Sequence, residues 1–269
     1  MPCAGCAVAM ADEGWRPSAD SGRRCVSCQR RGDSYMKRTV VHGSVGSLCA
    51  GILLVVGSAQ PAAAALGSIN WSPWTLQLPN NTQVSPGSTS NKWFYVSGSY
   101  QAFADPQTGI CTSGSSHCRT ELREKSTWSS WGNNVLNANC KVTKMSSSIA
   151  IGQVFCASGT NGAHTQVELF YRNGGFAVLY EEKKGAATTY SIGSGVSVGT
   201  PFSYQLSFIG GKMAVKINGS TKWTRTPSSA AQSGSFYFKA GNYDQGSSCG
   251  SISSTIRSVV RFSNISVSH

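Results

Sequence analysis

Short apolar runs with alternating polar positions recur along the chain, separated by turns rich in Gly, Ser and Asn. In one of them, Phe236, Phe238 and Ala240 alternate with Tyr237 and Lys239, which is the period of a strand with one buried face. No helical periodicity of useful length follows residue 65. Similar patterns predict further strands at 71–78, 92–96, 119–124, 147–155, 166–171, 176–180, 202–209, 213–217 and 258–267.

A tight hairpin is predicted where Asn218-Gly219 separates the runs 212–217 and 221–224, because Asn-Gly suits the positive φ angles of a type I′ turn. Short strands at regular spacing are typical of a β-sandwich or jelly roll. Residues 66–269 are sufficient for a real core. We therefore predict one all-β domain, a jelly-roll sandwich of two antiparallel sheets.

Residues 36–65 have the pattern of a secretory signal. Met36-Lys37-Arg38 is a short basic start, and the apolar run 45–56 is too short to span a bilayer. Small residues at 58–65 then favour cleavage near Ala64 or Ala65, with a membrane anchor as the alternative. The sequence thus predicts a secreted protein in an oxidising medium, with no membrane attachment after cleavage.

Residues 1–35 fit this interpretation poorly. They contain Cys3-x2-Cys6 and Cys25-x2-Cys28, a spacing typical of zinc ribbons. A folded zinc site ahead of an export signal makes little physical sense, since the signal acts near a free N-terminus. We interpret Met36 as the start of translation and 1–35 as an upstream extension outside the working protein.

Five cysteines fall within 66–269, so at least one remains unpaired in an exported protein. Cys111 and Cys118 bracket a Gly/Ser loop and are expected to close it. A second pair is expected among Cys140, Cys156 and Cys249, with the connectivity left open. Structural pairing is favoured over Cys–His catalysis.

The net charge of +12 is large for a chain with only 13% charged residues. Residues 1–65 hold seven of the 23 basic and four of the 11 acidic side chains, which leaves +9 on 66–269. The basic residues are scattered singly, unlike the dense Lys/Arg segments of nucleic-acid binders. The charge therefore predicts an anionic partner, an acidic polysaccharide or a membrane surface rather than nucleic acid. The protein itself is expected to be a monomer.

One predicted strand is unusually rich in charge. His117, Arg119, Glu121 and Arg123 have the same parity and so share one face. Four ionisable groups cannot face an apolar core at tolerable cost. They are expected to line a solvated groove or, alternatively, to form ion pairs on an outer surface.

Three segments resemble the signature segments of the alginate lyases of polysaccharide lyase family 7, in matching order and spacing and over most of 66–269. They are Arg119-Thr120-Glu121-Leu122-Arg123-Glu124, Gln153-Val154 and Tyr237-Phe238-Lys239-Ala240-Gly241-Asn242-Tyr243-Asp244-Gln245. The resemblance implies a jelly roll whose concave sheet forms the substrate groove. It also implies β-elimination of 1,4-linked polyuronates such as alginate, without metal or cofactor.

The resemblance also assigns roles to residues. Arg119 and Gln153 would neutralise the substrate carboxylate, and Tyr243 would protonate the departing O4. Nearby Lys239 and Arg119 would favour the phenolate and make Tyr243 a usable base as well. Flanking uronates would be bound by Arg123, Lys239 and Gln245. Glu121 would orient Arg119 or Arg123.

One position departs from the family pattern. The family has Gln-Ile-His or Gln-Val-His, whose His acts as base, and this chain has Phe155. In mannuronate or glucuronate the C5 proton and O4 leave from the same side of the sugar, so Tyr243 alone could serve first as base and then as acid. Alternatively His117 could supply an imidazole, whereas His164 lies in a Gly-rich loop and is a weaker candidate. Guluronate-rich alginate becomes the less favoured substrate, and a glucuronan-type polymer becomes more favoured.

A glycoside hydrolase and a non-catalytic binding module are the alternatives to the lyase. A glycoside hydrolase needs two carboxylates across the bond, but 66–269 has only seven acidic residues, and Glu121 and Glu124 have opposite parity. That function is poorly supported. A non-catalytic module that binds acidic polysaccharides remains an alternative, because Phe155 is compatible with lost elimination chemistry in a surviving basic groove.

Overall fold

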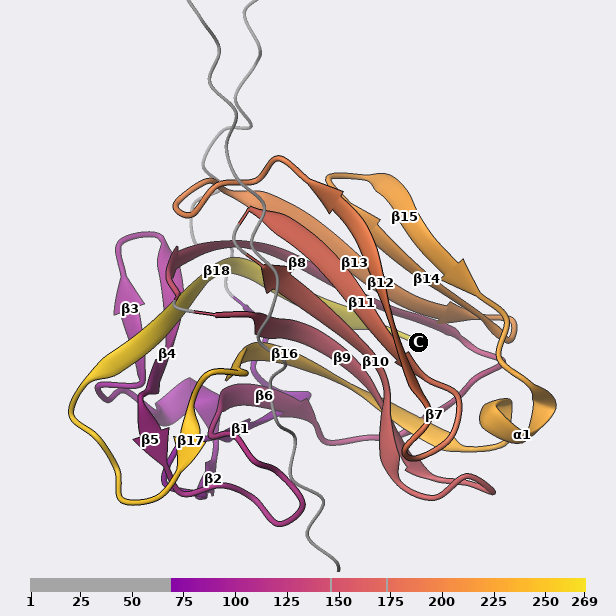
Figure 1. Ribbon diagram of the computed structural model, residues 1–269, viewed down its shortest axis with the longest axis horizontal. Helices are drawn as coiled ribbons and strands as arrows, with labels where there is room; N and C mark the ends of the chain where they lie inside the picture. Colours follow the sequence, from indigo (N-terminus) through magenta and orange to yellow (C-terminus); the bar gives the residue numbers. More distant parts are fainter. Residues whose placement is uncertain (1–68, 146, 173) are drawn as a thin grey trace, which may run out of the picture. The chain divides into compact units, whose positions relative to one another are not determined.

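The computed structural model describes residues 69–145, 147–172 and 174–269, so the predicted signal and the upstream cysteine pairs lie outside the described residues. Two antiparallel sheets pack against each other (Figure 1). The strand order is β12-β11-β10-β9-β16-β6-β1-β2 in the first sheet, where β7 also pairs with β16, and β15-β14-β13-β8-β18-β4-β3 in the second. The predicted all-β sandwich of two antiparallel sheets is confirmed.

The strands of the first sheet are β1 (Trp74–Gln77), β2 (Gln83–Val84), β6 (Thr120–Glu124), β7 (Trp128–Ser129), β9 (Ile149–Ser158), β10 (His164–Arg172), β11 (Gly175–Glu181), β12 (Ala187–Ser194) and β16 (Ser235–Asp244). Those of the second are β3 (Phe94–Ser97), β4 (Tyr100–Pro106), β8 (Asn133–Lys144), β13 (Phe202–Ile209), β14 (Lys212–Ile217), β15 (Ser220–Arg225) and β18 (Ile256–Ser268). A small parallel pair joins β5 (Thr108–Gly109) and β17 (Ser248–Cys249). The described helices are a 3-10 turn at Pro86–Ser88 and α1 (Ser229–Gln232), and neither is long and apolar enough to cross a membrane.

The core lies between the two sheets. Phe236 and Phe238 of β16 are fully buried in it, as their alternation predicts. The second sheet contributes aromatic rings such as Phe103 and Phe262, whose centroids are 5.1 Å apart. Because alternate residues of a strand point to opposite sides, Tyr237 and Lys239 face away from this core. We call that outer side of the first sheet the groove face.

Strand β16 is longer than predicted. It continues past Ala240 to Asp244, and its register with β9 shifts between Ala240 and Tyr243. Gly241 permits this course, since a Cβ there would lie 2.6 Å from the carbonyl oxygen of Thr120 on β6. The resulting bulge keeps Tyr243 within the sheet rather than beyond the strand end, packed with Ala150 on the groove face.

The predicted Asn-Gly hairpin is present, whereas several strands were not predicted. The β14–β15 hairpin is confirmed, with Asn218 and Gly219 at φ values of 48° and 77°. Strand β8 was missed because its Asn-rich sequence reads as a turn, although Leu136, Ala138 and Cys140 alternate as buried positions. Strands β4 and β12 were missed as well.

The predicted Cys111–Cys118 pair is wrong. Cys111 is joined instead to Cys249, across 138 residues of sequence. The buried thiol of Cys118 turns inward to the carbonyl of Pro106, at 3.7 Å. Cys118 is therefore free, as are the buried Cys140 and Cys156, between which no second pair forms.

Candidate active site

Glu121 is the centre of a charged cluster on the groove face. Its fully buried carboxylate accepts hydrogen bonds from Arg119 (3.2 Å) and Lys239 (3.0 Å) through Oε2, and from Gln153 (2.6 Å) through Oε1. Strand register explains this meeting, because β6, β16 and β9 are neighbours and Lys239 is paired directly with Gln153. Arg119 and Glu121 are too deeply buried for the alternative of ion pairs on an outer surface.

The cluster contains two cations and one carboxylate, so it keeps a positive excess. Lys239 is only 4% exposed and also donates to Oε1 of Gln77 on β1, at 3.2 Å. Burial lowers the pKa of Lys239 to about 8, against the opposing attraction of Glu121. An ammonium held in so little water interacts strongly with an incoming anion.

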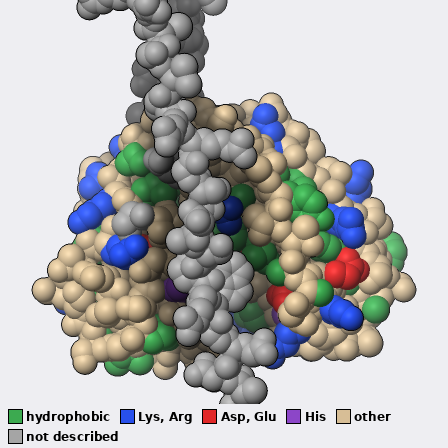
Figure 2. Space-filling model, viewed as in Figure 1, with side chains coloured by type: hydrophobic (Ala, Val, Ile, Leu, Met, Phe, Trp, Pro, Cys, Tyr) green, Lys and Arg blue, Asp and Glu red, His purple; other side chains and the backbone are tan. Residues whose placement is uncertain are grey.

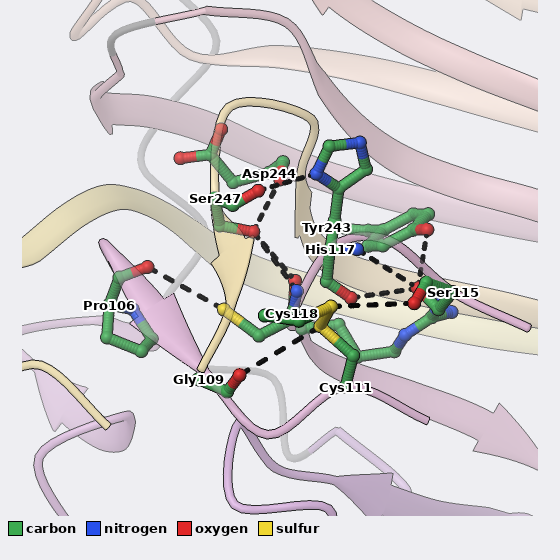
Figure 3. Close-up of a disulfide and its surroundings, with 11 residues drawn as sticks. Pro106, Gly109, Cys111, Ser115, His117, Cys118, Tyr243, Asp244 and Ser247 are labelled. Carbon is green, nitrogen blue, oxygen red and sulfur yellow. Dashed lines mark hydrogen bonds between the residues drawn. A yellow bond between two sulfur atoms is a disulfide. The ribbon is translucent and has the colours of Figure 1, made fainter. Parts of the chain in front are cut away.

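Tyr243 lies against this cluster. The guanidinium carbon of Arg119 is 3.9 Å from the centroid of the Tyr243 ring, which is cation–π geometry. The Tyr243 hydroxyl is 2.8 Å from Oγ of Ser115 (Figure 3). Arg119 Nη2 donates to the same Oγ at 2.8 Å. A phenol, a guanidinium and a hydroxyl thus meet at one point.

The pKa of Tyr243 is raised, which differs from the expectation that neighbouring cations would lower it. Burial is the main cause, and it outweighs the opposing effects of Arg119 and the hydrogen bond with Ser115. Lys239 instead directs its ammonium to Glu121. The resting side chain is therefore a phenol, suited to donating a proton.

Beside the cluster, aromatic and cationic side chains alternate across neighbouring strands. The Arg123 guanidinium lies over the ring of Tyr237, at 4.6 Å from its centroid. Tyr237 in turn stacks on Phe155, with centroids 5.0 Å apart, and Lys239 Nζ is 5.7 Å from the Phe155 ring. Phe155 therefore presents a flat apolar ring to the groove face, at the position where the family pattern has His.

The other predicted residues lie at different distances from this centre. His117 lies before β6, its ring 6.0 Å from that of Tyr243, and its Nδ1 is 2.6 Å from the carbonyl of Ser247. Nδ1 must carry the proton of that bond, so neutral His117 leaves Nε2 as a free acceptor. Gln245 follows β16 and donates to the Tyr243 carbonyl at 3.1 Å.

His164 is not part of the site. Its buried ring lies at the start of β10, with both nitrogens directed at carbonyl oxygens, those of Gly162 (2.9 Å) and Glu181 (3.2 Å). These bonds give it a structural role in closing the loop before β10.

Glu168 was not among the predicted site residues, although it is a groove-face carboxyl paired in register with Gln153. It is 9% exposed, and burial, reinforced by the charge of Glu121, raises its pKa to about 7. The alternation of 166–171 predicts a strand but does not say which of its two faces lies on the groove face. Only the pairing of β10 with β9 shows that the Glu168 side chain lies there. Ser115 and Gln77 were missed for the same reason, because their partners are distant in sequence.

The raised pKa of Glu168 makes stability depend on pH. Between about 4.5 and 7 the folded protein holds a proton that the unfolded chain releases, so stability falls as pH rises through this window. From pH 5 to pH 7.5 the wild type should lose about 2 kcal/mol more unfolding free energy than Glu168→Gln. Urea unfolding at the two pH values measures this difference, and equal changes in both proteins would contradict it.

The described residues contain no group of three or more His, Cys, Asp or Glu side chains placed to hold a metal ion. Figure 2 shows the Lys and Arg side chains spread singly over the visible surface, as the sequence predicted. The chemistry available to the described cluster is the binding of a carboxylate beside a buried phenol.

Comparison with known proteins gives a consistent result. A family model described as alginate lyase matches residues 69–269. The chain is similar to alginate lyase PA1167 from Pseudomonas aeruginosa, with 27% identity and a TM-score of 0.68 over 74% of this chain and 99% of that one. It is also similar to alginate lyase A1-II′ of polysaccharide lyase family 7, with 24% identity and a TM-score of 0.65 over 75% and 96%. The exolytic lyase AlyA5 from Zobellia galactanivorans has 18% identity and a TM-score of 0.62 over 73% and 95%. No curated protein matches.

Proposed function

Because the chain belongs to the alginate lyases of polysaccharide lyase family 7, we propose that this polysaccharide lyase acts on 1,4-linked polyuronate of the mannuronate type. The observation that carries this proposal is the meeting of Arg119, Gln153 and Tyr243 around Glu121 on one face. Two donors for a carboxylate thus share one face with a phenol that contacts one of them, Arg119. A1-II′ variants have been solved with the substrate GGMG and the product GGG, which supports a polyuronate as the ligand.

The proposed mechanism begins with neutralisation of the uronate carboxylate. Arg119 and Gln153 donate hydrogen bonds to it and so stabilise the negative charge that develops when C5 loses its proton. Glu121 holds both donors in place, as its hydrogen bonds show. Arg123, Lys239 and Gln245 hold the neighbouring uronates of the chain.

Proton transfer then follows on one side of the sugar. The resting Tyr243 phenol first releases its proton to solvent. The phenolate then takes the C5 proton, the C5–H electron pair forms the C4–C5 double bond, and the C4–O4 bond breaks. The phenol returns the proton to O4, which leaves an unsaturated uronate at the new chain end. His117, with Nε2 free, remains the alternative proton acceptor.

The mannuronate preference rests on Phe155. Its ring stacks on Tyr237 and carries no group that can accept a proton from the face opposite Tyr243. Elimination in which the proton and O4 leave from the same side needs only Tyr243. Glucuronan shares that stereochemistry and is the second candidate substrate.

Phe155→His is expected to broaden the substrates accepted. An imidazole at this position can serve as base on the opposite face, so activity on polyguluronate should rise at least tenfold while activity on polymannuronate changes little. Initial rates on the two polymers measure the ratio. Phe155→Leu is the matched control, since it removes the ring without adding a base, and a gain in both variants would contradict the role given to His.

The experiment that tests the proposed function is the ultraviolet absorbance of the purified protein mixed with polymannuronate, polyguluronate or glucuronan. Elimination creates a conjugated unsaturated uronate, so absorbance should rise fastest with polymannuronate. A faster rise with glucuronan would favour the second substrate. Binding of all three polymers without a rise would support the non-catalytic module instead.

We also propose that the protein is exported and acts as a monomer. The Cys111–Cys249 disulfide supports export, because such bonds persist in oxidising compartments.

A further inference from the structure

Ser115 occupies a special position between the two groups at the centre of the site. Its hydroxyl oxygen is 2.8 Å from the Tyr243 hydroxyl, accepts from Arg119 Nη2 at 2.8 Å, and donates to the carbonyl of His117 at 2.8 Å. Among the described residues, Ser115 is the side chain that hydrogen-bonds the Tyr243 hydroxyl. Nothing in the strand pattern or in the family segments includes it.

The single proton of Ser115 determines how this network works. While that proton points to the His117 carbonyl, the oxygen accepts from Arg119 and the Tyr243 phenol at 2.8 Å, and at a longer 3.3 Å from the His117 N–H. If the phenol loses its proton, the serine hydroxyl can rotate and donate to the phenolate, since hydroxyl hydrogens turn freely. One side chain can thus serve Tyr243 in both protonation states that the proposed mechanism requires.

The loop 111–118 that carries Ser115 is attached to the segment that follows Tyr243. The disulfide joins Cys111 to Cys249, and the Cys249 sulfur lies 3.5 Å from the carbonyl oxygen of Ser115. The Cys118 N–H donates to Ser247 Oγ at 3.1 Å. Figure 3 shows Ser115 between the Tyr243 hydroxyl and the disulfide. The crosslink therefore restrains the loop against the chain that holds the phenol.

We propose that Ser115 is a positioning residue for elimination, which fixes the Tyr243 hydroxyl and stabilises its phenolate, and that the Cys111–Cys249 disulfide holds Ser115 in that place. This inference rests on the proposed role of Tyr243. It adds a residue of the 111–118 loop to the machinery, and it assigns the crosslink a task in the site besides general stability.

The primary test is Ser115→Ala, with Ser116→Ala as the matched control. Ser116 is the next residue, is exposed, and makes no described side-chain hydrogen bond. Loss of one hydrogen bond to a charged oxygen should lower kcat by roughly 10- to 100-fold, while KM stays within about threefold because Glu121 still holds Arg119. Ser116→Ala should keep the wild-type kcat.

The pH profile separates positioning from a structural effect. Ser115 lowers the pKa of Tyr243, so its removal should move the limb of the kcat profile set by Tyr243 to higher pH. Ser115→Thr keeps the hydroxyl and should restore the profile. A wild-type kcat and profile in Ser115→Ala would overturn the proposal, as would an equal loss in Ser116→Ala.

The role of the disulfide is tested by a double-mutant cycle. Cys111→Ser with Cys249→Ser should lower kcat and shift the profile like Ser115→Ala, but should add less than about twofold when Ser115 is already Ala. If the losses in kcat multiply fully, the proposed link between the disulfide and Ser115 is overturned.

Tyr243→Phe distinguishes a failure of the inference about Ser115 from a failure of the proposed role of Tyr243. If it is inactive while Ser115→Ala is normal, only the inference about Ser115 fails. If it is fully active, the role proposed for Tyr243 fails and the inference about Ser115 fails with it, while the lyase activity itself stands.

Discussion

Tyr243→Phe is expected to lower kcat on polymannuronate by roughly 100- to 10,000-fold, because it removes the one group proposed to carry the proton from C5 to O4. The fold should survive. The phenylalanine ring still fills the space beside Ala150 and still faces the Arg119 guanidinium, whose cation–π contact involves the ring and not the hydroxyl. Initial rates from the ultraviolet absorbance of the unsaturated product measure the loss.

The matched control is Tyr95→Phe, the same chemical change on β3 of the second sheet. It should keep the wild-type rate. Oligouronate binding by Tyr243→Phe should also be retained, since the donors to the carboxylate are unchanged. Turnover within threefold of wild type would remove Tyr243 from the mechanism and leave His117 as the group to test next.

Strand parity explains why much of the site could be predicted from the sequence. Alternation in 119–123 put Arg119, Glu121 and Arg123 on one face, and the structure places all three on the groove face. The alternation of Phe236, Phe238 and Ala240 fixed the buried side of β16. Both inferences need only the period of two, which is a property of the backbone.

What escaped prediction depends on contacts between distant segments. The partner of Cys111 follows from the parallel pairing of β5 with β17, which no local pattern encodes. The approach of Tyr243 to Ser115 depends on the bulge at Gly241, which turns the strand end back into the sheet. The pKa of Glu168 is raised mainly because its carboxyl is buried, and the extent of that burial depends on all the strands that surround it.

The electrostatics of the cluster also show why Phe155 does not by itself exclude catalysis. A positive excess remains at Arg119 and Lys239 after Glu121 is counted, as long as Glu168, whose pKa is raised to about 7, keeps its proton. Neutralising the uronate carboxylate contributes much of the barrier reduction in such an elimination. In the proposed mechanism Tyr243 itself is the proton acceptor, so no imidazole is needed at position 155.

Glu121→Gln is the second variant with a large expected effect, here on stability. The change keeps the shape of the side chain but removes the carboxylate that pairs directly with the buried cations of Arg119 and Lys239. Below pH 7 the nearby Glu168 is mostly protonated and does not replace it. Breaking a buried pair from one side costs about 3–5 kcal/mol, a large part of the 5–15 kcal/mol typical of a domain. The free energy of unfolding in urea measures the loss.

Lys239→Met provides the matched comparison, because it removes one of the two cations while Glu121 stays paired with Arg119. It should cost clearly less than Glu121→Gln alone. Combined with Glu121→Gln it should also recover about 1–2 kcal/mol, since one fewer charge is left unpaired. Glu121→Gln could instead lower the free energy of unfolding by less than about 1 kcal/mol, with the same slope against urea concentration. That result would mean that solvent already screens the charges of Arg119 and Lys239. The cluster would then be open to solvent, whereas the proposed neutralisation of the uronate depends on buried donors.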